Sequence, residues 1–166
     1  MSALDRLQAL GLVLPAPTSP AGSYTSWRRS GNLLHLSGHV CKRDSKVISG
    51  KVGPGGQYAT AEAAKLAELA ALELLSTIHA AVGLDQIARV LKLTGFVNST
   101  PDFTEQPTVM NGASELLVAV LGPEVGTHAR SAVGVAQLPF GAAVEIDAIV
   151  ELRTDPPARM DVDNSA

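Results

Sequence analysis

The chain has 166 residues, of which 46% are hydrophobic, 17% charged and only 4% aromatic, with a formal net charge of −3. This length predicts one domain. The acidic balance and the scarcity of aromatic side chains disfavour a nucleic-acid partner, which would need a basic surface and stacking platforms. One cysteine excludes an intramolecular disulfide, and no apolar run is long enough for a signal peptide or a membrane span, so we expect a cytoplasmic protein with no membrane partner.

The N-terminal part of the chain is predicted to hold a helix, an extension and a hairpin. Leucines at helical spacing predict a helix over residues 3–10, and the prolines that follow favour an extended segment, so residues 1–19 form the expected N-terminal extension. Residues 24–29 and 33–40 flank a turn at Gly31 and predict a hairpin. The two sides of its second strand are Leu34, Leu36 and Val40, and His35, Ser37 and His39.

The rest of the chain alternates between helices and strands. Residues 60–82 contain no Pro or Gly and are rich in Ala and Leu, which predicts a helix with Thr60 as its N-cap and Gly83 as its C-cap. The later predicted elements are a strand over 89–97, a helix over 108–121, and strands over 129–136 and 143–152. This order predicts an α+β fold, a mixed sheet with two helices on one face. Residues 153–166 have little to bury and are expected to form a disordered tail.

The turn at residues 138–141 predicts that the last two strands pair directly as a hairpin. Aligning their apolar sides places Val133 opposite Ile146. In this register Arg130, Glu145 and Asp147 share the face of the sheet that is not covered by helices. An Arg on such a face can bind an anion as a bidentate fork.

The side of the strand that carries Arg130 also carries Ala132, Gly134 and Ala136. These side chains are too small for a core, so we expect this face to meet a neighbouring subunit. The predicted register separates Arg130 from Glu145 by about 13 Å at strand rise, too far for a direct contact. Two arrangements remain open, a small ligand between the two side chains or an Arg–carboxylate bridge across an oligomer interface. From the residues alone we favour the bridge.

Two segments carry a resemblance to a known family. Residues 128–150, HARSAVGVAQLPFGAAVEIDAIV, resemble the C-terminal signature of the RidA/YjgF family, and residues 31–39, GNLLHLSGH, are similar to its Gly-Asn-x-x-x-x-Ser-Gly-Gln strand. Gly22-Ser-Tyr24 resembles the family's Gly-Pro-Tyr sequence. The resemblance covers about residues 20–152, which we expect to form the RidA-like domain.

The resemblance implies a chorismate-mutase-like homotrimer with ligand clefts between subunits. In such clefts 2-imino and enamine acids are hydrolysed to 2-keto acids and ammonia, with no cofactor and no metal. By this resemblance Arg130 would hold the carboxylate of a small ligand and Glu145 would position or activate water. The other expected substrate contacts are Tyr24, Ser37, Gly38, His39 and Asn111.

The chain also departs from the family pattern. His39 stands where the family has Gln, Ala132 where it often has Cys, and His128 where it has Pro; a lengthening falls at residues 105–107. These departures indicate a divergent subgroup and leave the substrate open. Two other functions therefore stay in view, a trimeric carboxylate-binding protein without turnover and, ranked last for its acidic balance, an endoribonuclease. Cys41 is either a nucleophile beside His39 or a packed residue, and the four histidines lack metal-ligand spacing.

Overall fold

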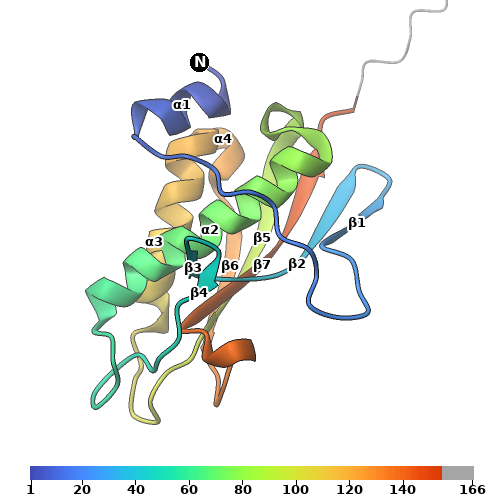
Figure 1. Ribbon diagram of the computed structural model, residues 1–166. Helices are drawn as coiled ribbons and strands as arrows, with labels where there is room; N and C mark the ends of the chain where they lie inside the picture. The colour runs from blue at the N-terminus through green and yellow to red at the C-terminus, as the bar shows by residue number, and fades with distance from the viewer. Residues whose placement is uncertain (155–166) are drawn as a thin grey trace, which may run out of the picture.

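The structure is a computed structural model, which describes residues 1–154 as a five-stranded sheet with helices on one face (Figure 1). The helices are α1 (Ala3–Ala9), α2 (Thr60–Val82), α3 (Gln106–Leu121) and the short α4 (Pro123–Gly126). The sheet strands are β1 (Trp27–Ser30), β2 (Leu33–Val40), β5 (Ile87–Val97), β6 (Ala129–Gly134) and β7 (Val144–Leu152). A small hairpin, β3 (Lys42–Arg43) with β4 (Lys46–Val47), and two 3-10 turns, Leu84–Gln86 and Pro139–Gly141, complete the described elements. The predicted α+β class and both main helices are confirmed.

The strand order in the sheet is β1-β2-β7-β5-β6. β5 and β6 are parallel and the other neighbours are antiparallel, so the sheet is mixed as predicted. The predicted hairpin between the last two strands is wrong, because β5 lies between β6 and β7. β5, α3 and β6 form one β-α-β unit, which brings its two strands together in parallel, and β7 then joins the opposite edge of β5. Strand alternation shows which side chains share a face but not which strand is the neighbour.

The helix α2 forms because its sequence favours helix throughout and buries one broad apolar surface. Its Ala and Leu side chains pack on the sheet and on α3, and nothing interrupts the backbone until Gly83, whose φ of 84° ends it. The predicted role of Thr60 as N-cap is wrong. Ala59 occupies that position and donates its backbone N–H to Glu62 over 2.9 Å, while the Thr60 hydroxyl donates to Glu105 over 2.7 Å, joining the starts of α2 and α3.

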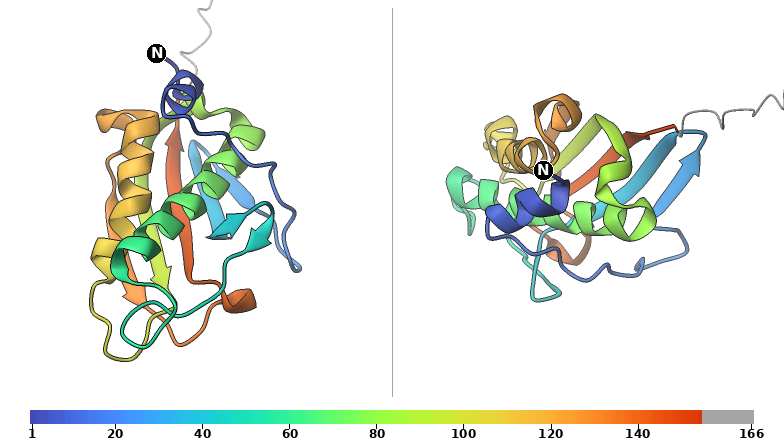
Figure 2. Two further views of the ribbon diagram at one scale, coloured as in Figure 1. Left: turned by 60° about the vertical axis from the view of Figure 1, so that its left-hand side comes forward. Right: turned by 90° about the horizontal axis from the view of Figure 1, so that it is seen from above.

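The helix α3 lies beside α2 at a very close crossing. A Cβ built on Gly112 would lie 2.0 Å from the backbone oxygen of Ala64, so only glycine fits between the two helices. Both helices cover the same face of the sheet, and the view from above shows the other face bare within this chain (Figure 2). This open face, as we call it, carries Glu145, Asp147 and Ile149 of β7, Thr94 and Phe96 of β5, and Ser131 and Val133 of β6.

An irregularity in β2 changes which way its side chains point. Leu36 pairs with Ala148 and His39 with Ile146, so three residues of β2 span two of β7, which is a β-bulge at Ser37–Gly38. The predicted alternation is therefore wrong beyond the bulge. His39 lies on the helix side with Leu36 and is buried, where the sequence pattern placed it on the opposite side.

The N-terminal extension runs across the outer side of α2 (Figures 1 and 2). α1 is capped by Ser2, whose hydroxyl accepts from the backbone N–H of Asp5, and it docks through the buried Ala3 and Leu7. Arg153, at the start of the expected tail, is held by its Nε donating to the Asp85 carbonyl over 2.9 Å. Residues 155–166 of that tail lie outside the described residues. Over residues 1–154 no helix combines the length and apolar character needed to cross a membrane.

The α2–α3 crossing predicts that Gly112→Ala destabilises the protein. An added methyl group would force the helices apart, so we expect a loss of about 1–3 kcal/mol in the free energy of unfolding, despite the helix propensity that Ala adds. Urea denaturation followed by circular dichroism measures the loss. Gly22→Ala is the control, since its methyl group would lie 3.4 Å from the Tyr24 ring in ordinary contact. Equal stability of the two variants would contradict the packing argument.

Candidate functional site

A small pocket opens where β2 is bulged. Its wall comes from the N-terminal extension, from the bulge, from the 3-10 turn before β7 and from β7 itself. The pocket holds about 100 Å³, well below the 300 Å³ that small-molecule sites usually reach. The space that one chain encloses here is therefore smaller than a usual small-molecule site. The lining residues that the sequence singles out are Tyr24, Ser37, Gly38, His39 and Glu145.

Glu145 is placed in this pocket by the bulge. A Cβ on Gly38 would lie 1.8 Å from its Oε1, so the absence of a side chain at residue 38 lets the carboxylate lie against the strand. Burial, and secondarily the negative charge of Asp147 two residues along β7, raise the pKa of Glu145. No described residue donates a hydrogen bond to this carboxylate. A half-buried carboxylate with a raised pKa and free oxygens is suited to accept a proton from water.

Tyr24 and Ser37 lie on either side of the same pocket. The Tyr24 ring is 53% exposed, and its hydroxyl accepts a long hydrogen bond of 3.4 Å from the backbone N–H of Ala21. The Ser37 hydroxyl donates to the Thr25 carbonyl over 2.6 Å, so its oxygen is left only as an acceptor. Tyr24 can therefore still donate to a ligand, whereas Ser37 can only receive a hydrogen bond.

His39 borders the pocket, but both of its ring nitrogens are already engaged. Nδ1 lies 2.7 Å from the Ser37 carbonyl and must carry the proton, so Nε2 accepts from the Thr77 hydroxyl over 2.8 Å. Burial lowers the pKa of His39, which keeps the ring neutral. The His39 side chain thus ties the bulge to α2, a role that its place in the predicted alternation did not reveal.

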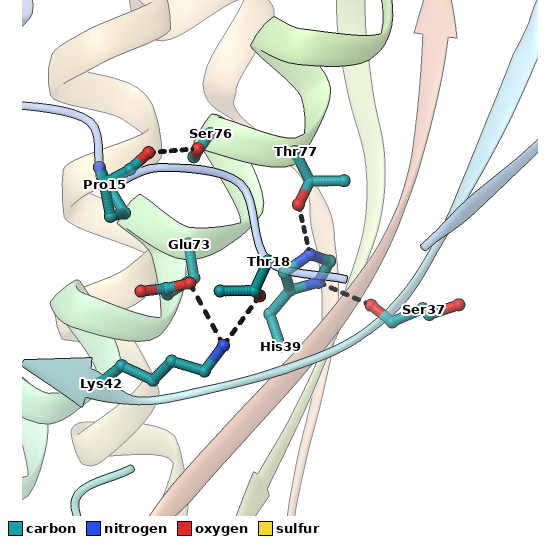
Figure 3. A network of polar contacts seen from close by, with 8 residues as sticks. All are labelled: Pro15, Thr18, Ser37, His39, Lys42, Glu73, Ser76 and Thr77. Carbon is teal, nitrogen blue, oxygen red and sulfur yellow. Dashed lines mark hydrogen bonds and ion pairs between the residues drawn. The ribbon is translucent and has the colours of Figure 1, made fainter. Parts of the chain in front are cut away.

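Next to His39 a polar network fastens the N-terminal extension to α2 (Figure 3). Lys42 forms an ion pair of 3.5 Å with the buried Glu73 and donates to the Thr18 hydroxyl over 2.8 Å. Ser76 donates to the Pro15 carbonyl over 2.5 Å. The extension is thereby held where its residues 18–21 form one wall of the pocket. Glu73 and Ser76 are buried polar residues on a surface of α2 that is otherwise mostly apolar.

Arg130 lies in a different place, on the edge strand β6 and on the helix side of the sheet. Its Nη1 donates to Asn111 over 3.1 Å and to Ser114 over 2.9 Å, and its Nη2 donates to the Pro107 carbonyl over 3.0 Å. Three of the five guanidinium donors are used, which leaves Nε–H and one N–H of Nη2 for a ligand. These two donors can bind a carboxylate as a fork.

The prediction that Arg130 shares one face of the sheet with Glu145 and Asp147 is wrong. Arg130 pairs with Leu93 of β5, which pairs with Ala148 of β7, and both of these residues are buried under the helices. Glu145 and Asp147 do share the open face, as predicted. The error follows from the wrong strand pairing.

The small residues of β6 lie on the helix side of the sheet and not on the open face, and their contact with a neighbouring subunit stays a prediction. Ala132 packs against the core of its own chain. A Cβ on Gly134 would lie 2.4 Å from Ser99 Oγ and 2.8 Å from Gln106 Nε2, so the space is taken by the chain itself. The open face is bare within this chain, and Val133 on this face is 45% exposed.

The expected site residues therefore form two groups within one chain. Tyr24, Ser37, Gly38, His39 and Glu145 line the pocket, whereas Arg130 and Asn111 are hydrogen-bonded to each other at the other edge of the sheet. The sheet order places β1, β2 and β7 on one side of β5 and β6 on its other side.

Cys41 is fully buried and is placed as a packed residue. Burial raises the pKa of its thiol, and Sγ donates to the Ile48 carbonyl over 3.4 Å. A raised pKa disfavours the thiolate, so the nucleophile interpretation of Cys41 lacks its chemical basis. Over the described residues, no three His, Cys, Asp or Glu side chains come together as metal ligands would.

Comparison with known proteins shows what this fold and these residues belong to. The chain matches the Endoribonuclease L-PSP family over residues 15–152 and is therefore a member of this family, the RidA/YjgF family that the two sequence segments resemble.

Individual relatives place the chain in a divergent part of the family. Protein TCP17 of Trypanosoma cruzi is 53% identical over 148 residues, covering 88% of this chain and 91% of that protein. The crystal structure of Atu1372 from Agrobacterium tumefaciens, a protein of unknown function, is 44% identical with a TM-score of 0.83, covering 91% of this chain and 92% of that one. The YjgF gene product of E. coli is 25% identical with a TM-score of 0.55, covering 83% and 94%. The chorismate-mutase-like α+β fold is thereby confirmed.

The network around Lys42 predicts a large effect of breaking its buried ion pair. Lys42→Met would leave Glu73 buried without a cation, and we expect it to lower the free energy of unfolding by about 2–4 kcal/mol. Lys42→Met/Glu73→Leu should recover at least half of this loss, because no uncompensated buried charge remains. Urea denaturation measures both.

Arg89→Met is the matched control for this prediction. Arg89 pairs with Glu151 over 2.8 Å, but its side chain is 63% exposed, so its loss should cost less than about 1 kcal/mol. If the double variant were less stable than Lys42→Met alone, the proposed desolvation cost of Glu73 would be wrong.

Proposed function

We propose that this protein is a hydrolytic deaminase of reactive 2-imino and enamine acids, acting in clefts between the subunits of a homotrimer. The observation that carries the proposal is the division of the site within one chain. A carboxylate suited to activate water lies at the β2 bulge, and an arginine with two free donors lies at the other edge of the sheet. A second copy that brings its Arg130 to the Glu145 pocket completes the site.

The small volume of the pocket supports a shared site. A space of about 100 Å³ takes only a few heavy atoms, so a four-carbon imino acid needs further walls. The open face offers apolar side chains, among them Ile149, Phe96 and Val133, for burial against other copies. Association through this face places the pocket of one subunit next to the β6 edge of another.

The reaction requires few catalytic groups, because an imine carbon is already electrophilic. Arg130 binds the carboxylate through Nε–H and Nη2–H and orients the C=N bond. Ionised Glu145 takes a proton from water while the water oxygen bonds to the imine carbon and the π electrons move to nitrogen. Glu145 then returns this proton to nitrogen, which gives a carbinolamine, and next carries the hydroxyl proton to the same nitrogen as the C–N bond breaks. Ammonia leaves and the hydroxyl oxygen becomes the carbonyl oxygen of the 2-keto acid.

The remaining residues receive supporting roles in this proposal. Tyr24 donates its hydroxyl proton to the ligand, and Ser37 accepts from the protonated imine nitrogen. Gly38 leaves room for the Glu145 carboxylate, and Asn111 orients Arg130. His39 holds the bulge from behind and does not donate to the ligand, since its one N–H is taken by the Ser37 carbonyl.

The first prediction of this proposal concerns turnover. The protein should release 2-oxobutanoate from 2-iminobutanoate, generated in situ by a threonine dehydratase, faster than the uncatalysed hydrolysis. Arg130→Ala should remove at least about 95% of this acceleration, because a lost charge-assisted fork costs 2 kcal/mol or more. Release of the keto acid, followed at saturating dehydratase, measures the effect.

Two controls accompany this assay. Light scattering should give the same trimeric mass for Arg130→Ala as for the wild type, since Arg130 bonds within its own chain. Arg43→Ala on the β3–β4 hairpin removes an exposed arginine away from the open face and should leave turnover unchanged. Carboxylate binding without any acceleration would replace the deaminase by the carboxylate-binding protein, and a monomeric wild type would overturn the shared site.

The second prediction concerns the pH dependence of turnover. Glu145 must be ionised to accept a proton, so its raised pKa places the acid limb of the pH–rate profile above that of an ordinary glutamate. Asp147→Asn removes the negative charge that helps to raise this pKa, so the limb should move to lower pH. Glu151→Gln is the control, because this carboxylate is neutralised by Arg89. A limb that moves to higher pH in Asp147→Asn would contradict the assignment of Glu145 as the base.

A further inference from the structure

Arg130 is the end of a hydrogen-bonded chain that begins at the start of β6. His128 Nδ1 lies 2.6 Å from the Gly126 carbonyl, and its Nε2 lies 2.9 Å from Ser114 Oγ. The same Ser114 oxygen lies 2.9 Å from Arg130 Nη1. Four groups, from α3, α4, β6 and the connection between α4 and β6, are thus joined in a line that ends on the guanidinium.

The chemistry of each group fixes the direction of these bonds. A carbonyl can only accept, so His128 Nδ1 carries the ring proton and donates to Gly126. In the neutral ring Nε2 then has a free lone pair and accepts the hydroxyl proton of Ser114. With its proton turned toward His128, the Ser114 oxygen presents a lone pair to Arg130.

Without His128 the Ser114 hydroxyl has another partner available. A serine inside a helix readily donates to the carbonyl four residues before it, which for Ser114 belongs to Met110. In that rotamer its oxygen turns along α3 and away from β6. Arg130 would then lose one of its three anchors, and its side chain on an edge strand would gain rotamer freedom.

We propose that His128 and Ser114 are positioning residues, which together hold the Arg130 guanidinium so that Nε–H and the free Nη2–H face the ligand. The inference rests on the proposed role of Arg130 in carboxylate binding. Neither residue touches the ligand in this proposal. His128 acts through Ser114, and Ser114 acts through Arg130, so the affinity for the carboxylate depends on both.

The surroundings of His128 support a neutral ring. Burial and the neighbouring positive charge of Arg130 lower its pKa, against the opposing effect of the Gly126 carbonyl. The ionisable side chain on α3 is Glu115 and that on α4 is Glu124, and neither forms an ion pair with His128 among the described residues. The lone pair on Nε2 is therefore kept for Ser114 at neutral pH.

The test is the dissociation constant of 2-oxobutanoate, the product of the proposed reaction, measured by titration calorimetry. His128→Leu and Ser114→Ala should each weaken binding about tenfold, the worth of one hydrogen bond to a charged group. The double variant should also be about tenfold weaker rather than a hundredfold, because both changes break the same link. His128→Gln places an amide oxygen near the site of Nε2 and should return the affinity to within about threefold of wild type.

Several results would overturn this proposal. They are wild-type affinity in His128→Leu or in Ser114→Ala, independent losses that multiply in the double variant, and a His128→Gln protein as weak as His128→Leu. The glutamine variant separates positioning from a general structural role, since both substitutions remove the imidazole but only glutamine restores the acceptor. His79→Leu, a histidine on α2 outside this chain of bonds, is the control for histidine loss.

Failure of the positioning role can be distinguished from failure of the proposed function. If Arg130→Ala binds 2-oxobutanoate as well as the wild type, the role of Arg130 itself fails. If Arg130→Ala abolishes binding while His128→Leu and Ser114→Ala leave it intact, the proposed function stands and only the positioning role is lost. Ser114→Ala places a good helix former in α3. The result for this variant therefore does not depend on whether the partly buried position of His128 tolerates leucine.

Discussion

The constraint on which the site depends is the bulge in β2 at Ser37–Gly38. One extra residue in this strand turns His39 inward to α2 and leaves a bare glycine backbone on the side of Glu145. A regular strand would bury residue 38 and direct His39 at Glu145. The extra residue thus converts a plain antiparallel pair into a pocket with a carboxylate on one side.

The groups behind the bulge give the pocket its rigidity. Glu73, Ser76 and Thr77 line one surface of α2, and each bonds to a different partner, Lys42, the extension and His39. Burying so many polar groups costs free energy unless all are satisfied, and here they are. The same helix therefore supports the bulge and fixes the wall formed by residues 18–21.

The elements and the β1–β2 hairpin could be predicted from the residues, but the neighbours of the later strands could not. The helix over residues 60–82 and the alternation of Val144 to Leu152 follow from periodicity, and Glu145 lies on the open face as that alternation predicts. The pairing of β6 with β5 depends on how α3 crosses the sheet, which local pattern does not encode. The wrong pairing of β6 put Arg130 on the wrong face, whereas its choice as a candidate site residue came from the resemblance of residues 128–150 to the family. The bulge could not be predicted from the sequence, because Ser37 and Gly38 fit a regular strand equally well.

The place of β7 in the sheet has a consequence for how the chain acquires its structure. Among the described strands β7 is synthesised last, yet it lies between β2 and β5 and joins the two parts of the sheet. Until it arrives, β2 and β5 have no common neighbour, and the apolar surfaces of α2 and α3 have only half a sheet to cover. Contacts between distant parts of a chain form slowly, and unfinished sheets expose edges that can pair with other chains. A ribosome-bound chain that lacks β7 is therefore the stage at which this protein most needs protection from aggregation.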